Sequence, residues 1–306
     1  MAHETDRVSK EYFDQLDRFS DLVNYALYNG REVTKPSDFR ELDPVRSEVL
    51  SPDNSFEVLL DNLKELSLKE DDKNIYAMIG LESQNYQDES MVLRVMKAKT
   101  LLYYYQFRKG EKPLKPVIII VLNLLSAKWR CPVNLKEMFE KEYLDKFGNL
   151  IDDVSYVLLD ITEDSVIPKG LLKTDLELLL NCLKFSNNRP KLEEYIEKEK
   201  GFNSLDDITF KLINKLSVLD VEIKEKGGKV KMWPAVKQMK EESYNSGYNS
   251  GYNSGYNSGY DNGLNIGELK FADKMVNSHM LTIEQAAMSL NLTVEEYLAA
   301  VKNLKK

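Results

Sequence analysis

Two carboxylates and one amide are the residues in this chain whose types and spacing could do chemistry. Glu82 and Gln84 end the apolar run at 75–81, and Asp61 lies about twenty residues earlier. Along a strand, alternation would put Glu82 and Gln84 on one face. A buried ionised carboxylate costs several kcal/mol unless a cation or hydrogen bonds compensate it. A divalent metal would supply that compensation.

A hairpin would bring these side chains together. Residues 58–68 can form a strand, and the polar turn at 70–74 leads into a second strand at 75–84. Asp61 and Glu82 would then approach each other from neighbouring strands, with oxygen ligands that suit Mg²⁺ or Mn²⁺. Two other interpretations stay open. The pair can be a solvated strand end, or the first segment can be a helix, because an apolar stripe also fits helical spacing: Phe56, Leu59, Leu60, Leu63 and Leu66.

Several short segments, spread over about two thirds of the chain, carry a resemblance to a known family. They are 21–30, Lys35-Pro36, 41–43, 76–84, Ser90-Met91, 94–96, Trp129, Pro132 and 173–176. On these segments, the region from Phe13 to about Leu219 resembles the Rpn family of recombination-promoting nucleases and putative transposases, of the PD-(D/E)XK superfamily.

The resemblance implies a fold, an activity and a set of site residues. The fold is an α/β PD-(D/E)XK (restriction-endonuclease-like) core, here with an α-helical C-terminal extension. The activity is Mg²⁺-dependent endonucleolytic cleavage of DNA in recombination or mobile-element biology. Asp61 and Glu82 would bind the metal. Gln84, where many relatives of the superfamily have lysine, would position the attacking water or a phosphate oxygen, and Asp21 would assist.

The chain departs from the family pattern beside these positions. Leu60 stands in place of arginine, Ser83 in place of asparagine, Ala98-Lys99 in place of Tyr-Asp, and 123–125 in place of Tyr-Phe-Gly. These changes motivate an alternative from another class. In it the chain is a catalytically decayed nuclease that keeps the fold and acts as a DNA- or protein-interaction module.

Basic residues cluster directly after the expected metal strand, although the net charge of the chain is −8. A helix is expected near 89–108, and the cations available for DNA phosphates are Arg94, Lys97, Lys99, Arg108 and Lys109. Each neutralised phosphate would add salt-dependent affinity. The alternative is a solvated helix face whose long side chains cover apolar surface.

Composition favours a cytoplasmic protein and excludes several other classes. No apolar run reaches the roughly 18 residues that span a bilayer, and the N-terminus has no signal-peptide pattern. Two cysteines do not make a disulfide framework. The two histidines lie at opposite ends of the chain, which argues against a Ser-His-Asp or Cys-His mechanism.

The expected organisation has three parts. Residues 1–230 form the nuclease-like domain, in which the strand at 75–84, the helix near 89–108 and the apolar strand at 116–122 make a βαβ unit, with a further strand near 154–159. Residues 231–267 are a linker that contains Tyr-Asn-Ser-Gly repeats, and residues 268–306 are a small helical hairpin.

The repeats predict a flexible spacer, because Gly, Asn, Ser and Tyr are poor helix formers. If they are helical, their Gly and Tyr rows could pack against a second copy of the chain. Beyond them, Thr282 and Thr293 each begin a capping-box pattern. We expect this hairpin to serve homo-oligomerisation and not to read DNA, because its second helix begins with acidic residues.

Overall fold

The computed structural model describes residues 2–42, 60–70, 73–162, 165, 167–217 and 229–304. The chain divides into two compact units, Met1–Val236 and Lys237–Lys306. The first unit therefore extends slightly beyond the expected boundary at residue 230. Phe56 and Leu59 of the alternative helical stripe, Asp43 of the family segments, and 71–72 of the expected turn lie outside the described residues.

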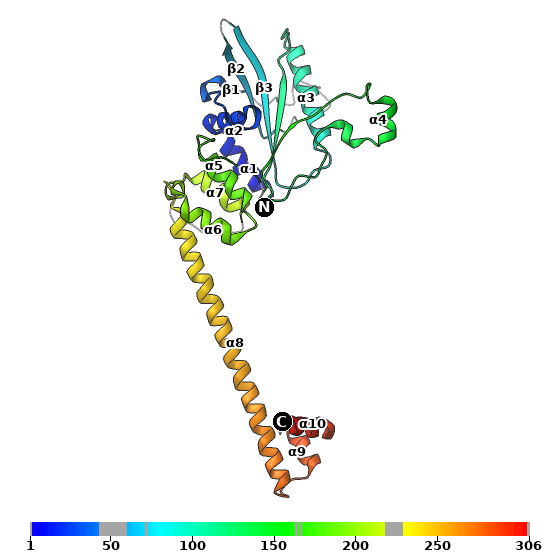
Figure 1. Ribbon diagram of the computed structural model, residues 1–306, viewed down its shortest axis with the longest axis vertical. Helices are drawn as coiled ribbons and strands as arrows, with labels where there is room; N and C mark the ends of the chain where they lie inside the picture. The colour runs from blue at the N-terminus through cyan, green and yellow to red at the C-terminus, as the bar shows by residue number, and fades with distance from the viewer. Residues whose placement is uncertain are drawn as a thin grey trace. The chain divides into compact units, whose positions relative to one another are not determined.

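The first unit is built on a five-stranded mixed sheet whose strands lie in chain order (Figure 1). The strands are β1 (Phe39–Glu41), β2 (Asn62–Glu70), β3 (Lys73–Gln84), β4 (Val117–Asn123) and β5 (Val157–Asp160). The first three are antiparallel neighbours, while β3, β4 and β5 run parallel. The α/β class and the expected hairpin are confirmed. The helical interpretation is wrong for Leu63 and Leu66, which lie in β2.

Helix α3 (Met91–Arg108) connects the parallel strands β3 and β4 and covers one face of the sheet. Parallel strands need such a crossover, and their continuous Val/Ile runs are buried on both sides. The core between this helix and the sheet consists of Met78, Met91, Val92, Val95, Ala98, Leu102, Val117, Ile119, Val121, Trp129, Cys131, Leu135 and Tyr156. Met78, Glu82 and Gln84 share this face, because alternate residues of a strand point the same way.

The other helices complete the first unit. They are α1 (Ala2–Asp14), α2 (Leu16–Tyr28), α4 (Lys141–Phe147), α5 (Leu176–Lys184), α6 (Arg189–Lys198) and α7 (Asp207–Leu216), with short 3₁₀ turns η1 (Pro36–Asp38), η3 (Leu135–Met138) and η4 (Lys200–Asn203). Helix α1 packs on α2, α7, β2 and β3. It lies on the face of β3 opposite α3, since Ser9 Oγ donates a hydrogen bond to Ser83 Oγ at 2.8 Å.

A buried ion-pair network joins four segments of this helical layer. The Arg18 guanidinium donates from Nε and Nη2 to the two carboxylate oxygens of Asp175, at 2.9 and 2.7 Å. Its Nη2 also bonds Asp206 and Thr209, and its Cζ lies 4.2 Å from the centre of the Tyr12 ring. We call these five residues the Arg18 cluster.

The second unit contains most of α8 (Met232–Asn277), together with α9 (Ile283–Ser289) and α10 (Val294–Leu304). The last part of α8 and the two short helices share a small core of Ala272, Ala286, Ala287, Tyr297 and Val301. Thr282 forms the predicted capping box with Gln285, and Thr293 bonds Glu296 in both directions. The expected helical hairpin is therefore present.

The expectation of a flexible spacer at the repeats is wrong, because residues 244–267 are helical within α8. Tyrosines four residues apart are neighbours on one helix face. Their rings lie nearly parallel, with centroids 6.3 to 6.4 Å apart, at Tyr244, Tyr248, Tyr252, Tyr256 and Tyr260. This row of ring contacts favours the helix that the propensities of the individual residues disfavour.

Within the described parts of the chain, no helix combines the length and the apolar character that a bilayer span requires.

Candidate functional site

The expected carboxylates meet at one end of the sheet. Asn62 of β2 pairs with Leu81 of β3, so that Asp61, directly before β2, lies beside Glu82. Glu82 in turn pairs with Val121 of the parallel strand β4. The structure thus brings Asp61 and Glu82 to the same strand end, together with Gln84.

Glu82 is 3% exposed, and its two oxygens have different surroundings. Oε1 accepts hydrogen bonds from Gln84 Nε2, at 3.1 Å, and from Arg94 Nη2. Oε2 is buried with no hydrogen-bond partner among the described residues, and the same holds for Gln84 Oε1. Burial and the charge of the neighbouring Asp61 raise the pKa of Glu82 to about 8, although Arg94 and the Asp61 backbone N–H act in the opposite direction.

Asp61 is held by the strand that carries Glu82. Its Oδ2 accepts a hydrogen bond from the Ser83 N–H at 2.8 Å. Burial raises the pKa of Asp61, the bond from Ser83 lowers it, and Asp6 raises it further. Two carboxylates that are desolvated side by side favour a shared cation, since each disfavours ionisation of the other.

Helix α1 brings residues to this site that the sequence analysis missed. Asp6 and Lys10 are near enough to act electrostatically on Asp61, and Asp6 accepts a bond from Asn85 Nδ2 at 3.2 Å. The available signal was their spacing, because residues four apart share one face of a helix. Nothing in the sequence pairs that face with a strand end more than 70 positions later.

The donor set consists of oxygen atoms, which fit Mg²⁺ or Mn²⁺ better than metals that prefer nitrogen or sulfur ligands, such as Zn²⁺. The described residues contain no cluster of three or more His, Cys, Asp or Glu side chains arranged to hold a metal. Glu82 Oε2 and Gln84 Oε1 are buried oxygens without partners, and Asp61 offers Oδ1. Mg²⁺ commonly takes only one or two carboxylates and keeps several waters. Asp61 and Glu82 could therefore hold it together with water, with Gln84 Oε1 available to accept a hydrogen bond from such a water.

The five predicted DNA-binding cations have different environments. Lys97 and Arg108 are exposed on α3, and Lys109 is exposed directly after it. Lys99 is half-buried and donates to the Ser155 carbonyl oxygen at 2.7 Å. Arg94, also half-buried, pairs with Glu82 and with Asp88. The structure thus presents three of the five to solvent and places Arg94 within the carboxylate site.

The predicted assistant Asp21 has a structural environment. Its Oδ2 accepts bonds from the backbone N–H groups of Lys173 and Thr174, at 2.9 and 2.8 Å, and from the Thr174 hydroxyl at 2.7 Å. The Asp21 carboxylate thus fixes the segment that leads into α5. These contacts explain its position without a role in chemistry.

Some residues that depart from the family pattern make ordered contacts here. Asn123, at the end of β4, donates to Asp160 Oδ1 at 2.7 Å and to the Ala127 carbonyl oxygen at 2.8 Å. Leu60 packs over Gly80, and a β-carbon added to Gly80 would lie 2.9 Å from Leu60 Cδ1. The strand ends around the carboxylates are therefore well packed despite the replacements.

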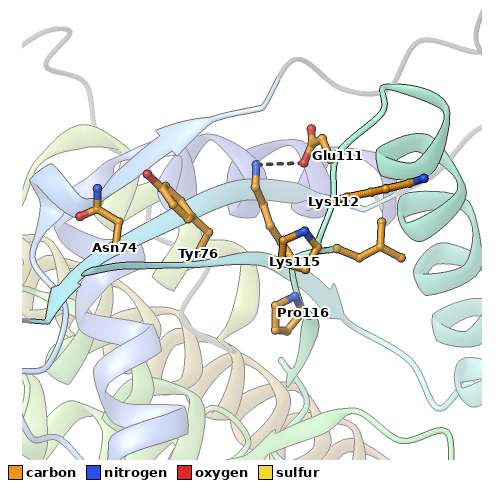
Figure 2. A pocket seen from close by; sticks show the side chains of 8 residues that line it. Asn74, Tyr76, Glu111, Lys112, Lys115 and Pro116 are labelled. Carbon is orange, nitrogen blue, oxygen red and sulfur yellow. Dashed lines mark ion pairs between the residues drawn. The ribbon is translucent and has the colours of Figure 1, made fainter. Parts of the chain in front are cut away.

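A separate pocket of about 610 Å³ lies at the start of β3 (Figure 2). Asn74, Tyr76, Glu111, Lys112 and Lys115 are among its lining residues. Lys115 is held by Glu65 and Glu111, with Nζ 5.5 Å from the centre of the Tyr76 ring. Because Tyr76 and Glu82 lie six residues apart on one strand, this pocket is not part of the carboxylate site.

Comparison with known proteins gives one match. A family model described as "Putative transposase, YhgA-like" matches residues 3–226, which include the sheet and both carboxylates. No curated protein matches the chain. No solved structure matches it either.

Proposed function

Since this chain belongs to the YhgA-like putative transposase family, we propose that its first unit is a metal-dependent DNA endonuclease of the PD-(D/E)XK type, acting in recombination or mobile-element biology. The supporting observation is the buried pair of Asp61 and Glu82. Glu82 Oε2 and the neighbouring Gln84 Oε1 have no hydrogen-bond partner in the part of the chain that the structure describes. Buried polar atoms are nearly always paired, so a local group of unpaired acceptors suggests a site for a cation.

The residues divide the work by their chemistry. Asp61 and Glu82 would hold Mg²⁺ or Mn²⁺, and when bound the cation supplies Lewis-acid polarisation of the phosphate. Gln84 cannot take a proton, so its role is orientation. Its Nε2 donates to Glu82, which leaves Oε1 free to accept a hydrogen bond from the attacking water.

Helix α3 provides the positive surface for DNA. Its 18 residues extend about 27 Å, from the carboxylate site near its N-terminus to Arg108 at its end. Lys97 and Arg108 are exposed along it, and Lys109 is exposed directly after it. Contacts to phosphates would position the duplex without reading its sequence.

Cleavage of plasmid DNA with Mg²⁺ tests the proposal. Asp61→Ala and Glu82→Ala should each abolish nicking, while Glu142→Ala, an exposed carboxylate on α4, should nick as the wild type does. Equal nicking by wild type, Asp61→Ala and Glu82→Ala would reject the assignment.

A second candidate function is supported by the cation already at Glu82. Arg94 pairs with this carboxylate, and Leu60 stands where the family has arginine. A decayed nuclease would keep the fold and bind DNA or protein without cutting. Binding of duplex DNA by the wild type, with no nicking in either Mg²⁺ or Mn²⁺, would favour this candidate.

The C-terminal region is our candidate for homo-oligomerisation. The stacked tyrosines of α8 are more than 60% exposed, and the neighbouring glycines leave open space where a β-carbon would be. A ridge of rings beside a row without side chains suits a second copy of the same helix. Combined Tyr248→Ala, Tyr252→Ala and Tyr256→Ala substitutions should lower the mass measured by light scattering. Tyr143→Ala, an exposed tyrosine of α4, is the control, and an unchanged mass in the triple variant would refute the idea.

A further inference from the structure

Arg94 occupies an unusual position for a residue of a basic helix. It lies in the first turn of α3 and bridges two carboxylates. Its Nη2 donates to Glu82 Oε1, and its Nη1 donates to Asp88 Oδ2 at 2.9 Å. The Arg94 side chain is 35% exposed, while the Glu82 side chain is 4% exposed. The guanidinium thus reaches from the surface to a buried metal ligand.

The two carboxylates hold Arg94 differently. Asp88 is itself fixed, because its Oδ1 accepts bonds from the Ser90 N–H, at 2.9 Å, and from the Ser90 hydroxyl, at 2.6 Å. Glu82 contributes one oxygen to Arg94 and shares that oxygen with Gln84. Loss of the bond to Glu82 would therefore leave Arg94 anchored on Asp88.

A divalent cation on Glu82 would change the charge balance around Arg94. Among the described residues, Arg94 is the cation that pairs with the Glu82 carboxylate. A second, doubly charged cation on the same group would repel the guanidinium at close range. Arg94 is 35% exposed and lies on the same helix as the exposed Lys97, so a released guanidinium would remain available to a phosphate bound along α3.

We propose that Arg94 is an exchangeable counter-cation. It neutralises Glu82 while no metal is bound, is displaced when a divalent cation takes Glu82, and then binds a DNA phosphate while Asp88 retains it. This inference rests on the proposed nuclease function. In this proposal Arg94 contacts phosphate only when a metal occupies Glu82, whereas an exposed lysine contacts phosphate whether or not metal is bound.

The salt dependence of DNA binding tests the exchange, because each phosphate contact contributes about 0.9 to the slope of log K against log salt concentration. Binding of a labelled duplex is measured by fluorescence anisotropy in EDTA at pH 9, above the Glu82 pKa of about 8, so that Glu82 is ionised. The proteins compared are wild type, Glu82→Gln, Arg94→Gln and the double variant. Glu82→Gln removes the charge that holds Arg94, so its slope should be steeper than that of wild type by about 0.9. Arg94→Gln and the double variant should both match wild type.

Two controls separate the release of Arg94 from the change in the net charge of the protein. Glu142→Gln removes an exposed carboxylate of α4 and should leave the slope unchanged. Ca²⁺, used as a divalent probe, should steepen the wild-type slope by about 0.9 more than it steepens that of Arg94→Gln. If Arg94→Gln leaves Glu82 unpaired and the protein does not fold, the double variant, which leaves neither charge unpaired, carries the comparison with Glu82→Gln.

The outcomes distinguish the inference from the proposed function. Equal slopes for wild type and Glu82→Gln, or a double variant that keeps the steep slope of Glu82→Gln, would overturn the inference and leave the nuclease proposal standing. A steep Glu82→Gln slope with no response of wild type to Ca²⁺ would support the hold of Glu82 on Arg94 but overturn the exchange with metal. No binding of duplex by any protein would reject both.

Discussion

The Arg18 cluster and the Glu82 site both combine one arginine with two carboxylates, but they differ in how completely the polar atoms are paired. Arg18 is 3% exposed and binds both oxygens of Asp175 in parallel, with Asp206 and Thr209 as further partners. Arg94 gives only one nitrogen to each of its carboxylates. Parallel bidentate pairs are strong and fix geometry.

The unpaired atoms also differ in kind. In the Arg18 cluster the unpartnered atom is a donor, Arg18 Nη1, whereas beside Glu82 they are two acceptors, Glu82 Oε2 and Gln84 Oε1. An isolated donor cannot attract a cation, but two buried oxygens beside a second carboxylate can. The comparison indicates that the Arg18 cluster serves stability and that the Glu82 site is prepared for a ligand.

The largest expected effect is loss of stability in the Arg18 cluster. Asp175→Ala leaves Arg18 buried without its bidentate partner, and breaking a buried pair in this way costs about 3 to 5 kcal/mol. Denaturant unfolding measures the change, with Asp145→Ala on the exposed surface of α4 as the control. A loss no larger than that of the control would show that the cluster does not hold the helices together.

The next effect concerns metal binding at the Glu82 site. At a Mg²⁺ concentration a hundred times its dissociation constant, wild type should gain about 2.7 kcal/mol of stability, measured as a rise in Tm. Glu82→Gln and Asp61→Asn should lose this gain, while Asp145→Asn should keep it. If Mg²⁺ raised the Tm of Glu82→Gln as much as that of wild type, the metal would bind elsewhere in the protein.

A pH series without metal should show the cost of the buried Glu82 charge. Its pKa is raised in the folded protein to about 8, mainly by burial, so the folded state binds the proton more tightly than the unfolded chain. This stabilisation is complete below the unfolded pKa of about 4.5 and is lost as pH rises through about 8. Between pH 6 and pH 9 wild type should lose about 2 kcal/mol more than Glu82→Gln. Parallel curves for the two proteins would contradict the raised pKa.

The smallest expected effect tests the pairing in the Arg18 cluster. Thr209→Val removes a hydroxyl that binds Arg18 Nη2 and both carboxylates, which should cost about 1 kcal/mol. Thr100→Val, on the exposed face of α3, is the matched control and should change stability little. Equal losses of stability for Thr209→Val and Thr100→Val in chemical denaturation would indicate that the Arg18 cluster does not depend on complete pairing of its polar atoms.

The sequence by itself determined the parts of the fold that depend on local pattern. Alternation and apolar runs identified β3 and β4, and helical periodicity identified α3 between them. The spacing of Asp61 and Glu82 across a hairpin placed both at one strand end. The capping boxes at Thr282 and Thr293 depend on residues three positions apart, which is why they could be read directly.

Only the tertiary structure decided which charges meet. Arg94 belongs by sequence to a basic helix, yet the connection from β3 to α3 turns it onto Glu82. Asp21 and Arg18 meet partners more than 150 positions away, and Ser9 of α1 meets Ser83 of β3. Such pairs depend on how elements pack, and the residue types alone do not specify them.

The repeat in α8 shows the same limit within a single helix. Each of its residues is a poor helix former, so propensity predicted a spacer. The structure instead stacks Tyr244, Tyr248, Tyr252, Tyr256 and Tyr260 along the helix surface. The physical reason is that ring contacts between successive turns exist only once the helix has formed, and a residue-by-residue scale contains no term for them.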